Sequence, residues 1–417
     1  MKHLITYFFI VLFTLNLSAQ DDNLKSRKVL VGADLLLTEN LNLIKHKKLG
    51  IITNQTSLIS YHRIPLVDTL INRNDVKITA LFAPEHGLLG DIPAGDIVPN
   101  NKFYRTGVPI YSLFGKVKKP TKEMLKNIDI LIYDIQDVGA RFCTYISTLY
   151  YALQAAAENN IPIIVLDRPD PITGLNIDGP VLKKEFESFI GTAPIPIQYG
   201  MTPGELAKML NETGMIGKNL RAHLTVIKMK YWERGLYYDK CNLYWMKPSP
   251  NIFYIVTAII YPGTCLLEGT NISEGKGTGY PFQLIGAPFV NSKDLAKELN
   301  SFKISGIEVE PKDFTPKEIP NIITNPKYKG QLCHGIKITV SNRYKFDAVK
   351  LGIKLLYVLH KLYPKEFKFN STHFDRLTGS QLIRKQILSN QTPDKIINTW
   401  QSDLKGFKEI RKKYLLY

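Results

Sequence analysis

The sequence predicts an α/β fold, with a Rossmann-like N-terminal domain built on a parallel sheet and a smaller α+β C-terminal domain. The first observation is that short apolar runs, typical of buried strands, alternate with stretches of helical spacing from residue 27 to about residue 166. The second is that strands and helices mix without this alternation after residue 255. Alternating strands and helices form βαβ units, whose parallel sheet is covered on both faces.

Five apolar runs are the predicted strands of the N-terminal sheet: residues 29–33, 49–53, 78–83, 128–135 and 161–166. Between the last two, residues 145–159 carry apolar side chains at helical spacing and are followed by Asn160, a fair stop signal. Thr202, Pro203 and Glu205 have the spacing of a capping box, so a helix is predicted to begin there. Residues 225–231 are the next predicted strand.

The connector at residues 247–251, with the sequence KPSPN, is the predicted domain boundary because its prolines keep it extended. We therefore expect a catalytic domain over residues 24–255 and a second domain over residues 256–417 that completes a cleft. Within the second domain, residues 335–340 are a predicted strand and residues 346–360 a predicted helix.

Polar residues follow three of the predicted strands: Asn54 after the second, Glu85 and His86 after the third, and Gln136, Asp137 and Arg141 after the fourth. Parallel strands bring their carboxyl ends to one edge of a sheet, where ligands bind in open α/β folds. We expect these groups to converge there. From this stretch alone, an equal alternative is that Glu85 is a solvated acid in a loop and His86 is a turn residue.

A glycine-rich loop at residues 261–278 adds further candidates: Glu268, Asn271, Glu274 and Lys276. Glycine lets a backbone approach a ligand closely, so such loops often bind ligands. A simple connector is the alternative interpretation. No G-x-G-x-x-G follows the first predicted strand and no P-loop is present, so a nucleotide site is poorly supported.

The formal net charge of +17 favours anionic partners such as nucleic acid, lipid headgroups or acidic polymers. Residues 1–20 have the parts of a secretory signal peptide: Lys2, an apolar stretch and small residues before an acidic start. We therefore expect a periplasmic or secreted protein without stable membrane insertion. Export makes nucleic acid an improbable partner and an acidic wall polymer a suitable one.

Four cysteines, Cys143, Cys241, Cys265 and Cys333, are scattered without C-x-x-C spacing, which argues against a structural zinc site. The sequence is compatible with one or two disulfides and also with buried free thiols. No metal site and no cofactor are expected.

Several motifs, taken in order, resemble the NamZ-type exo-β-N-acetylmuramidase family. They are PEHG (84–87), DIQDVGARF (134–142), LDRP (166–169), GMT (200–202), PSPN (248–251), YPGTC (261–265), EGTN (268–271) and SEG (273–275). The resemblance extends over nearly all of the chain from about residue 28. The chain departs from the family pattern at Cys143, Lys276 and Tyr280, where Tyr, Arg and Arg are more usual.

The resemblance implies a Rossmann-like domain, a smaller C-terminal domain and an active cleft between them. It also implies removal of terminal N-acetylmuramic acid from the non-reducing ends of peptidoglycan fragments (MurNAc-GlcNAc), without a cofactor. Glu85 matches the family's leading catalytic glutamate. The oligomeric state stays open.

Glycoside hydrolysis needs a proton donor at the leaving oxygen and support for an oxocarbenium-like transition state. Glu85 is the predicted acid. For the second role, a carboxylate (Asp137, Glu268 or Glu274) is one route, and attack by the substrate's 2-acetamido group, with Asp137 orienting it, is the other. The predicted catalytic residues are therefore Glu85, Asp137 and Glu274.

The predicted substrate-binding residues are Asn54, His86, Gln136, Arg141, Glu268, Asn271 and Lys276. Arg141 is the first candidate to pair with the lactyl carboxylate of muramic acid, and Lys276 the second. A structural salt bridge from Arg141 to Asp134 or Asp137 is the alternative.

Two other functions compete with a hydrolase. One is a non-catalytic peptidoglycan-binding protein, against which the several acids in one polar loop cluster argue. The other is a cell-wall amidase or esterase, for which no G-x-S-x-G or H-E-x-x-H motif is present.

Overall fold

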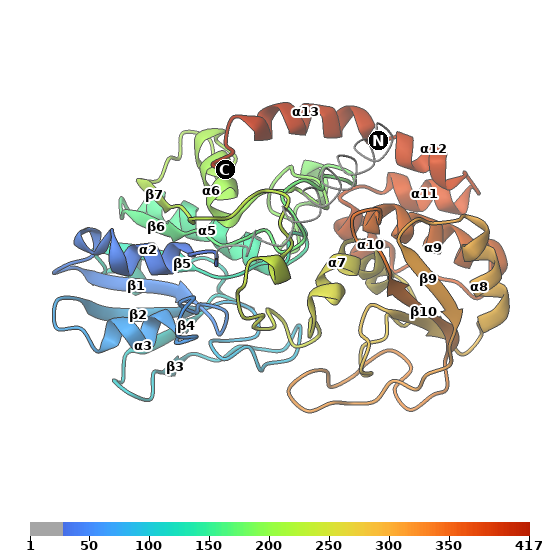
Figure 1. Ribbon diagram of the computed structural model, residues 1–417, viewed down its shortest axis with the longest axis horizontal. Helices are drawn as coiled ribbons and strands as arrows, with labels where there is room; N and C mark the ends of the chain where they lie inside the picture. Colours follow the sequence, from blue (N-terminus) through green and yellow to red (C-terminus); the bar gives the residue numbers. More distant parts are fainter. Residues whose placement is uncertain (1–27) are drawn as a thin grey trace, which may run out of the picture.

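The computed structural model describes residues 28–417, so the predicted signal peptide lies outside the described residues. Two lobes lie side by side in this part of the chain (Figure 1). The N-terminal lobe contains a seven-stranded sheet, and the C-terminal lobe contains a three-stranded sheet. The α/β fold with a smaller second domain is confirmed.

The N-terminal lobe alternates strands with helices. Its strands are β1 (Lys48–Thr53), β2 (Lys77–Ala83), β3 (Asn101–Lys102), β4 (Pro109–Ser112), β5 (Ile130–Asp134), β6 (Ile163–Leu166) and β7 (Leu224–Ile227). Its helices are α2 (Gly32–Thr38), η1 (Leu41–Leu43), α3 (Leu66–Ile71), α4 (Lys122–Leu125), α5 (Thr144–Glu158), η2 (Lys184–Phe186), α6 (Pro203–Glu212) and η3 (Tyr238–Lys240).

The strand order in the larger sheet is β3-β4-β2-β1-β5-β6-β7, and all pairs are parallel except β3 with β4. The order runs one way from β1 to β4 and the other way from β5 to β7. The carboxyl ends of β1 and β5 therefore flank a switch point, the place where open α/β sheets bind ligands.

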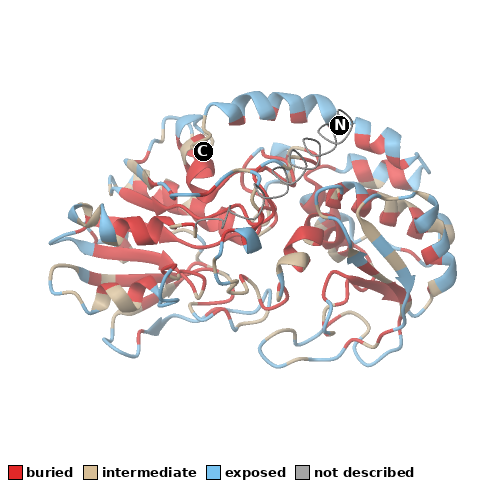
Figure 2. Ribbon diagram, viewed as in Figure 1, coloured by how far each residue is buried: buried red, intermediate tan, exposed pale blue. Residues whose placement is uncertain are grey.

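Apolar side chains of this sheet pack on both faces. On one face α2 and α3 cover the strands with residues such as Leu36 and Leu70, and on the other α5 and α6 do so with Leu149 and Leu206. Figure 2 shows the central strands β1, β2, β5 and β6 buried along nearly their whole length. Burial on both faces explains why the strands were readable as continuous apolar runs.

The C-terminal lobe has the sheet order β8-β10-β9, with both pairs antiparallel. Its strands are β8 (Leu284–Ala287), β9 (Ile307–Pro311) and β10 (His334–Val340). Its helices are α7 (Ile255–Thr264), η4 (Cys265–Gly269), α8 (Ser292–Ser301), α9 (Ala348–Leu362), α10 (Ser371–Thr378), α11 (Leu382–Leu388), α12 (Pro393–Asn398) and α13 (Gln401–Lys412).

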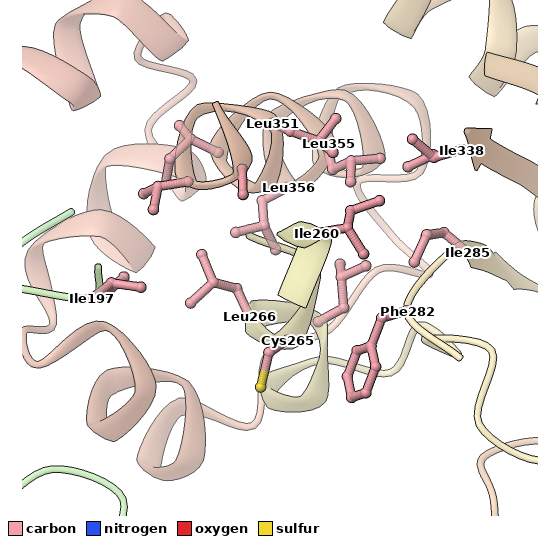
Figure 3. Packing of buried hydrophobic residues seen from close by; sticks show 14 of the residues in the cluster. Ile197, Ile260, Cys265, Leu266, Phe282, Ile285, Ile338, Leu351, Leu355 and Leu356 are labelled. Carbon is pink, nitrogen blue, oxygen red and sulfur yellow. The ribbon is translucent and has the colours of Figure 1, made fainter. Parts of the chain in front are cut away.

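Helices α7 and α9 cross at two glycines. A Cβ on Gly263 would lie 1.8 Å from the carbonyl oxygen of Ala348, and one on Gly352 would lie 2.5 Å from that of Gly263. This close crossing organises the core in Figure 3, where Ile260 of α7 lies near Leu355 and Leu356 of α9. The same core includes Ile197, so apolar packing is continuous between the lobes.

Helix α13 crosses back from the C-terminal lobe to the N-terminal lobe (Figure 1). Residues beyond it bond to the buried carboxylates there: Tyr417 Oη donates to Asp167 Oδ2 at 2.6 Å, and Leu416 N donates to Glu205 Oε1 at 2.7 Å. The two lobes are thus joined by a second covalent crossing besides the connector.

One strand prediction is wrong. Residues 29–33 do not form a strand, because only Leu30 makes an isolated bridge, to Lys230, and α2 begins at Gly32. Helix α2 lies tightly against the sheet, since a Cβ on Gly32 would meet the backbone N of Asp167 at 2.4 Å. The predicted helix start at Thr202 is confirmed as a capping box with Glu205. Among the described helices, none has the length and apolar character needed to cross a bilayer.

Candidate active site

A cavity of about 320 Å³ lies between the lobes and is lined from both. Its polar and aromatic lining comes from the N-terminal lobe, the connector and the C-terminal lobe: Glu85, His86, Thr144, Tyr145, Ser249, Asn251, Tyr261, Glu268, Lys276, Phe282 and His373. The predicted site residues Glu85, His86, Glu268 and Lys276 are brought together here.

Glu85 follows β2 after Pro84, which ends the strand because proline lacks an N–H. Its Oε2 accepts a hydrogen bond from Thr144 Oγ1 at 2.6 Å, and its Oε1 accepts one from Gly95 N at 3.1 Å. Thr144 is the first residue of α5. Two donors from different segments therefore fix a partly exposed carboxyl group at the cavity wall.

His86 is buried and has a φ of 71°, a left-handed conformation uncommon for a residue with a side chain. Its Nδ1 lies 2.8 Å from the carbonyl oxygen of Ile92. A carbonyl only accepts, so Nδ1 carries the proton. Burial lowers the pKa of His86, although the neighbouring Glu85 opposes that shift. The ring is thus neutral near pH 7, with Nε2 as an acceptor.

Four charged residues form what we call the ionic wall of the C-terminal lobe: Glu268, Glu274, Lys276 and Lys327. Lys276 Nζ lies 2.5 Å from Glu268 Oε1 and 3.6 Å from Glu274 Oε1, and Lys327 Nζ lies 3.0 Å from Glu274 Oε2. Burial alone would raise the pKa of Glu268, but Lys276, His373 and Lys327 together outweigh it and lower that pKa to about 2. Glu268 therefore faces the cavity as a carboxylate.

Asn251 offers the cavity an unused acceptor. It is 2% exposed, its Nδ2 donates to the carbonyl of Ile322 at 3.3 Å, and its Oδ1 has no hydrogen-bond partner among the described residues. The bond to Ile322 fixes which end of the amide is the oxygen. A buried acceptor without a partner is costly, so a ligand N–H or O–H that reaches it would be favoured.

Three other predicted site residues, Asn54, Gln136 and Asp137, lie in a separate strand-end layer that also includes Ser57, Asp134 and Arg168. Arg168 Nε lies 2.5 Å from Asp134 Oδ1, and the hydroxyl of Ser57 also donates to Asp134. The hydroxyl of Tyr199 donates to Asp137, and burial raises the pKa of Asp137 to about 6. The strand ends converge as expected, but these groups mostly bond one another.

Asn54 and Gln136 bond to other residues of this region. Asn54 Oδ1 accepts from Thr56 Oγ1 at 2.6 Å, and Gln136 Nε2 donates to the carbonyl of Pro169 at 2.7 Å. The cavity lining does not include Asn54, Gln136 or Asp137.

Arg141 is placed differently from its predicted position opposite a substrate carboxylate. It is 1% exposed, and its guanidinium donates to the carbonyls of Pro180 (2.8 Å), Ile195 (2.7 Å) and Leu377 (2.8 Å). Burial lowers its pKa to about 9, so it remains charged at neutral pH. Since Leu377 belongs to α10, Arg141 connects the two lobes and does not line the cavity. The alternative salt bridge to Asp134 is made by Arg168 instead.

Two predicted residues of the glycine-rich loop also lie outside the cavity lining. Glu274 supports Lys276 from behind, as part of the ionic wall. Asn271 bridges backbone groups, donating to the carbonyl of Glu366 at 2.8 Å and accepting from Lys368 N at 2.8 Å. The first acts on the cavity through another residue, and the second holds a loop.

Sequence reasoning missed Thr144, Asn251 and His373. Thr144 follows the DIQDVGARF motif and Asn251 ends the PSPN motif, so both stood within segments already singled out. His373 lies in the first turn of α10, far along the chain, with no motif around it.

The four cysteines are free thiols, which decides between the two alternatives for them. Within residues 28–417, no group of three or more His, Cys, Asp or Glu side chains is arranged to hold a metal ion.

Comparisons with known proteins agree with the motifs. Residues 49–255 match the family model of the N-terminal domain of exo-β-N-acetylmuramidase NamZ, and residues 259–417 match that of its C-terminal domain. The chain is 47% identical over 404 residues to the peptidoglycan β-N-acetylmuramidase NamZ of Bacillus subtilis (strain 168), covering 96% of this chain and 94% of that protein.

Two crystal structures of DUF1343 family proteins from Bacteroides fragilis are also similar. One has a TM-score of 0.84 at 35% identity, covering 94% of this chain and 99% of the other. The second has a TM-score of 0.74 at 33% identity, covering 93% of this chain and 99% of the other. Since both lobes match and the sequence likeness extends over nearly the whole chain, this protein belongs to the exo-β-N-acetylmuramidase NamZ family.

Proposed function

We propose that this protein is an exo-acting glycoside hydrolase that releases terminal β-1,4-linked N-acetylmuramic acid from the non-reducing ends of peptidoglycan fragments. The observation that carries the proposal is Glu85, held by Thr144 and Gly95 at the wall of a cavity between the lobes. Membership of the NamZ family supports the same substrate class.

The size of the cavity supports an exo mode of action. At about 320 Å³ it is near the lower end of small-ligand sites, roughly 300–1,000 Å³. A site of that size suits one terminal sugar ring better than the middle of a long glycan. The natural substrate would be a fragment ending in the disaccharide MurNAc-GlcNAc.

Glu85 is the proposed general acid. When protonated, its carboxyl group donates to the glycosidic oxygen, and the bond from that oxygen to the anomeric carbon breaks. Among the carboxylates considered for the second role, Glu268 lines the cavity and its low pKa keeps it ionised. Glu268 is thus suited to stabilise positive charge on the sugar.

Attack by the substrate's own 2-acetamido group is the other route. Asn251 favours this route, because its free Oδ1 would accept from the acetamide N–H and orient the group. NMR of the released sugar within the first minutes, before anomerisation, tests the acetamide route. Inversion requires a carboxylate that activates water and would exclude this route, whereas retention agrees with attack by the acetamide or directly by a carboxylate.

We further propose that the mature protein acts in the periplasm or outside the cell, as residues 1–20 suggest. N-terminal sequencing of the fractionated protein tests this. Recovery of an intact Met1 on membrane-bound protein would contradict it.

The function is tested by incubation with a chromogenic β-N-acetylmuramide. A non-catalytic wall-binding protein would release no aglycone, and an amidase or esterase would instead cleave peptide or acyl groups from the polymer. Release of the aglycone distinguishes the proposed hydrolase from both.

Replacing Glu85 with Gln is the accompanying variant. Glutamine keeps the size of the side chain but is no proton donor of comparable strength, so turnover should fall roughly 10²-fold or more. The natural disaccharide is the stricter substrate, because an aryl leaving group needs little protonation. Glu158→Gln, which removes a surface ion pair with Lys119, is the matched control and should keep full activity. Turnover of Glu85→Gln within a few-fold of the wild type would remove Glu85 from the catalytic role.

A further inference from the structure

We propose that His373 recognises the carboxylate of the lactyl ether of N-acetylmuramic acid, and so distinguishes this sugar from N-acetylglucosamine. The inference rests on the proposed function, because it assumes that a muramic acid residue occupies the cavity. It replaces Arg141, the first residue predicted for this role, which does not line the cavity and whose Nη1 and Nη2 donate to backbone carbonyls.

Three residues that line the cavity can carry a positive charge: His86, Lys276 and His373. His86 is neutral near pH 7, because burial lowers its pKa and its Nδ1–H bonds to Ile92. Lys276 is charged but already lies against Glu268 and Glu274. Of the three residues, His373 has the longest contact to its partner, 3.9 Å from Nε2 to Glu268 Oε2, and so its ring is the most available to a ligand.

The balance of charge in the ionic wall points the same way. Glu268 and Glu274 carry two negative charges, and Lys276 and Lys327 carry two positive ones, all linked within 3.6 Å. The wall as a whole therefore offers an incoming carboxylate no net attraction. A protonated His373 adds the charge that makes this side of the cavity positive.

The geometry of His373 suits this role. The backbone N of His373 donates to Asn370 Oδ1 at 3.2 Å, which anchors the residue in the first turn of α10. Its side chain is 36% exposed, and its Nε2 lies 3.9 Å from Glu268 Oε2. The gap of 3.9 Å to Glu268 and the exposure of the ring leave it able to donate to a ligand.

Charged groups around His373 come from both lobes. Glu268 of η4 and Lys276 face it from the C-terminal lobe, and Glu85 and His86 line the cavity from the N-terminal lobe. Helix α11 packs against α10, but its Arg384 is paired with Asp375, two residues along α10 from His373 and so on another side of that helix. Glu268 is thus the charged group that acts most directly on His373.

The proposal is tested with two ligands that differ in one charge. The inhibition constant of free N-acetylmuramic acid, measured against the chromogenic muramide, is compared with that of its lactyl N-methylamide, which is neutral. His373→Gln should weaken binding of the acid by about tenfold or more, as expected for loss of a charge-assisted hydrogen bond, and change binding of the amide little. His373→Lys should restore part of the preference for the acid.

His334→Gln is the matched control. His334 also lies beside a carboxylate, with Nδ1 2.9 Å from Asp313 Oδ2, but it does not line the cavity. This variant should leave both inhibition constants unchanged. Equal weakening of both ligands in His373→Gln would instead assign His373 a structural role and overturn the proposal.

The wild-type protein gives a test that does not depend on any variant folding. Its preference for the acid over the amide should fall as the pH rises from about 5 to 8, the range over which histidine side chains in general lose their charge. A ratio that stays constant over this range contradicts the proposal.

Failure of the proposed function has a different signature. If no aglycone is released, calorimetric titration with the same two ligands replaces the inhibition assay. A His373-dependent preference for the acid would then support the inference while the hydrolase proposal fails.

Discussion

The strand-end layer and the cavity lining contain the same kinds of residue but use them differently. In the strand-end layer, the charge of Asp134 is matched by Arg168, and the hydroxyl of Ser57 donates to the same carboxylate. In the cavity, Glu85 is held by only two neutral donors, and Asn251 Oδ1 has no partner. Residue type therefore does not identify a ligand site here. Unpartnered buried atoms do not identify it either, because Asp137 Oδ1 of the strand-end layer has no partner, as is true of Asn251 Oδ1; what distinguishes Asn251 is that it lines the cavity.

This comparison explains why a buried cation is poor evidence for anion binding. Arg141 looks like a substrate anchor in the sequence, because it follows a strand end and is next to acidic residues. Its donors instead satisfy carbonyls of three separate segments, Pro180, Ile195 and Leu377. Only its Nε has no partner among the described residues, and because Arg141 does not line the cavity, the guanidinium stabilises the fold and does not reach a ligand there.

The largest effect is expected for Arg141→Ala. It leaves three buried carbonyls without their donor, each costing ~1–3 kcal/mol, so the free energy of unfolding should fall by about 4 kcal/mol or more. Urea denaturation measures this. Arg105→Ala, which removes an exposed ion pair with Asp68, is the control and should change stability by less than about 1 kcal/mol.

The ratio of activities completes the Arg141 experiment. Any folded Arg141→Ala protein should lose activity on the muramide and on the corresponding β-N-acetylglucosaminide by the same factor. A selective loss on the muramide would mean that Arg141 does read the lactyl carboxylate, and the distinction between the two regions would fail at this residue.

An intermediate effect is expected for Asp137→Asn, and it depends on pH. Burial raises the pKa of Asp137 to about 6 in the folded protein, above the usual aspartate value of 3.8. The unfolded chain therefore loses this proton first as the pH rises, so wild-type stability falls between about pH 4 and 6 and stays lower above that. Asparagine does not titrate, so the stability of the variant relative to wild type should rise by up to about 3 kcal/mol over this range.

Denaturation curves at pH 4 and pH 7 give the measurement. Asp75→Asn is the control with the opposite sign, because a hydrogen bond from Arg73 lowers the pKa of Asp75. A stability difference for Asp137→Asn that does not change with pH would show that the pKa of Asp137 is the same in the folded and the unfolded protein.

The smallest effect is expected for Thr144→Val, which removes one donor to Glu85 and keeps the shape of the side chain. A less well oriented carboxyl group should lower kcat by about tenfold. Thr148→Val, one turn along α5, is the control because its hydroxyl bonds only to the carbonyl of Thr144. Equal kcat values for the two variants would mean that Thr144 does not position Glu85.

Much of the N-terminal lobe was predictable because β1, β2, β5 and β6 are buried on both faces and read as continuous apolar runs. The same criterion failed at residues 29–33. An apolar run of that length fits a strand or a helix packed on a sheet equally well, and the structure has α2 beginning at Gly32.

The site was predictable only in part, and for a physical reason. Glu85 and His86 could be placed because Pro84 ends their strand at a ligand-binding edge. The direction in which Arg141 points depends on carbonyls more than 30 residues away, which local sequence does not encode. His373 enters the cavity from α10 through packing alone, so no local signal marks it.

The contacts of Tyr417 bear on when the protein can finish folding during synthesis. Asp167 at the end of β6 accepts from Tyr417 Oη, and the two residues are 250 positions apart. Arg411 similarly donates to the carbonyl of Gly200, 211 positions earlier. Although domains usually fold in the order in which the ribosome makes them, the N-terminal lobe cannot satisfy these groups until residue 417 has emerged. Its native state is therefore reached only after synthesis of the second lobe, which leaves a long interval in which the chain is incompletely folded.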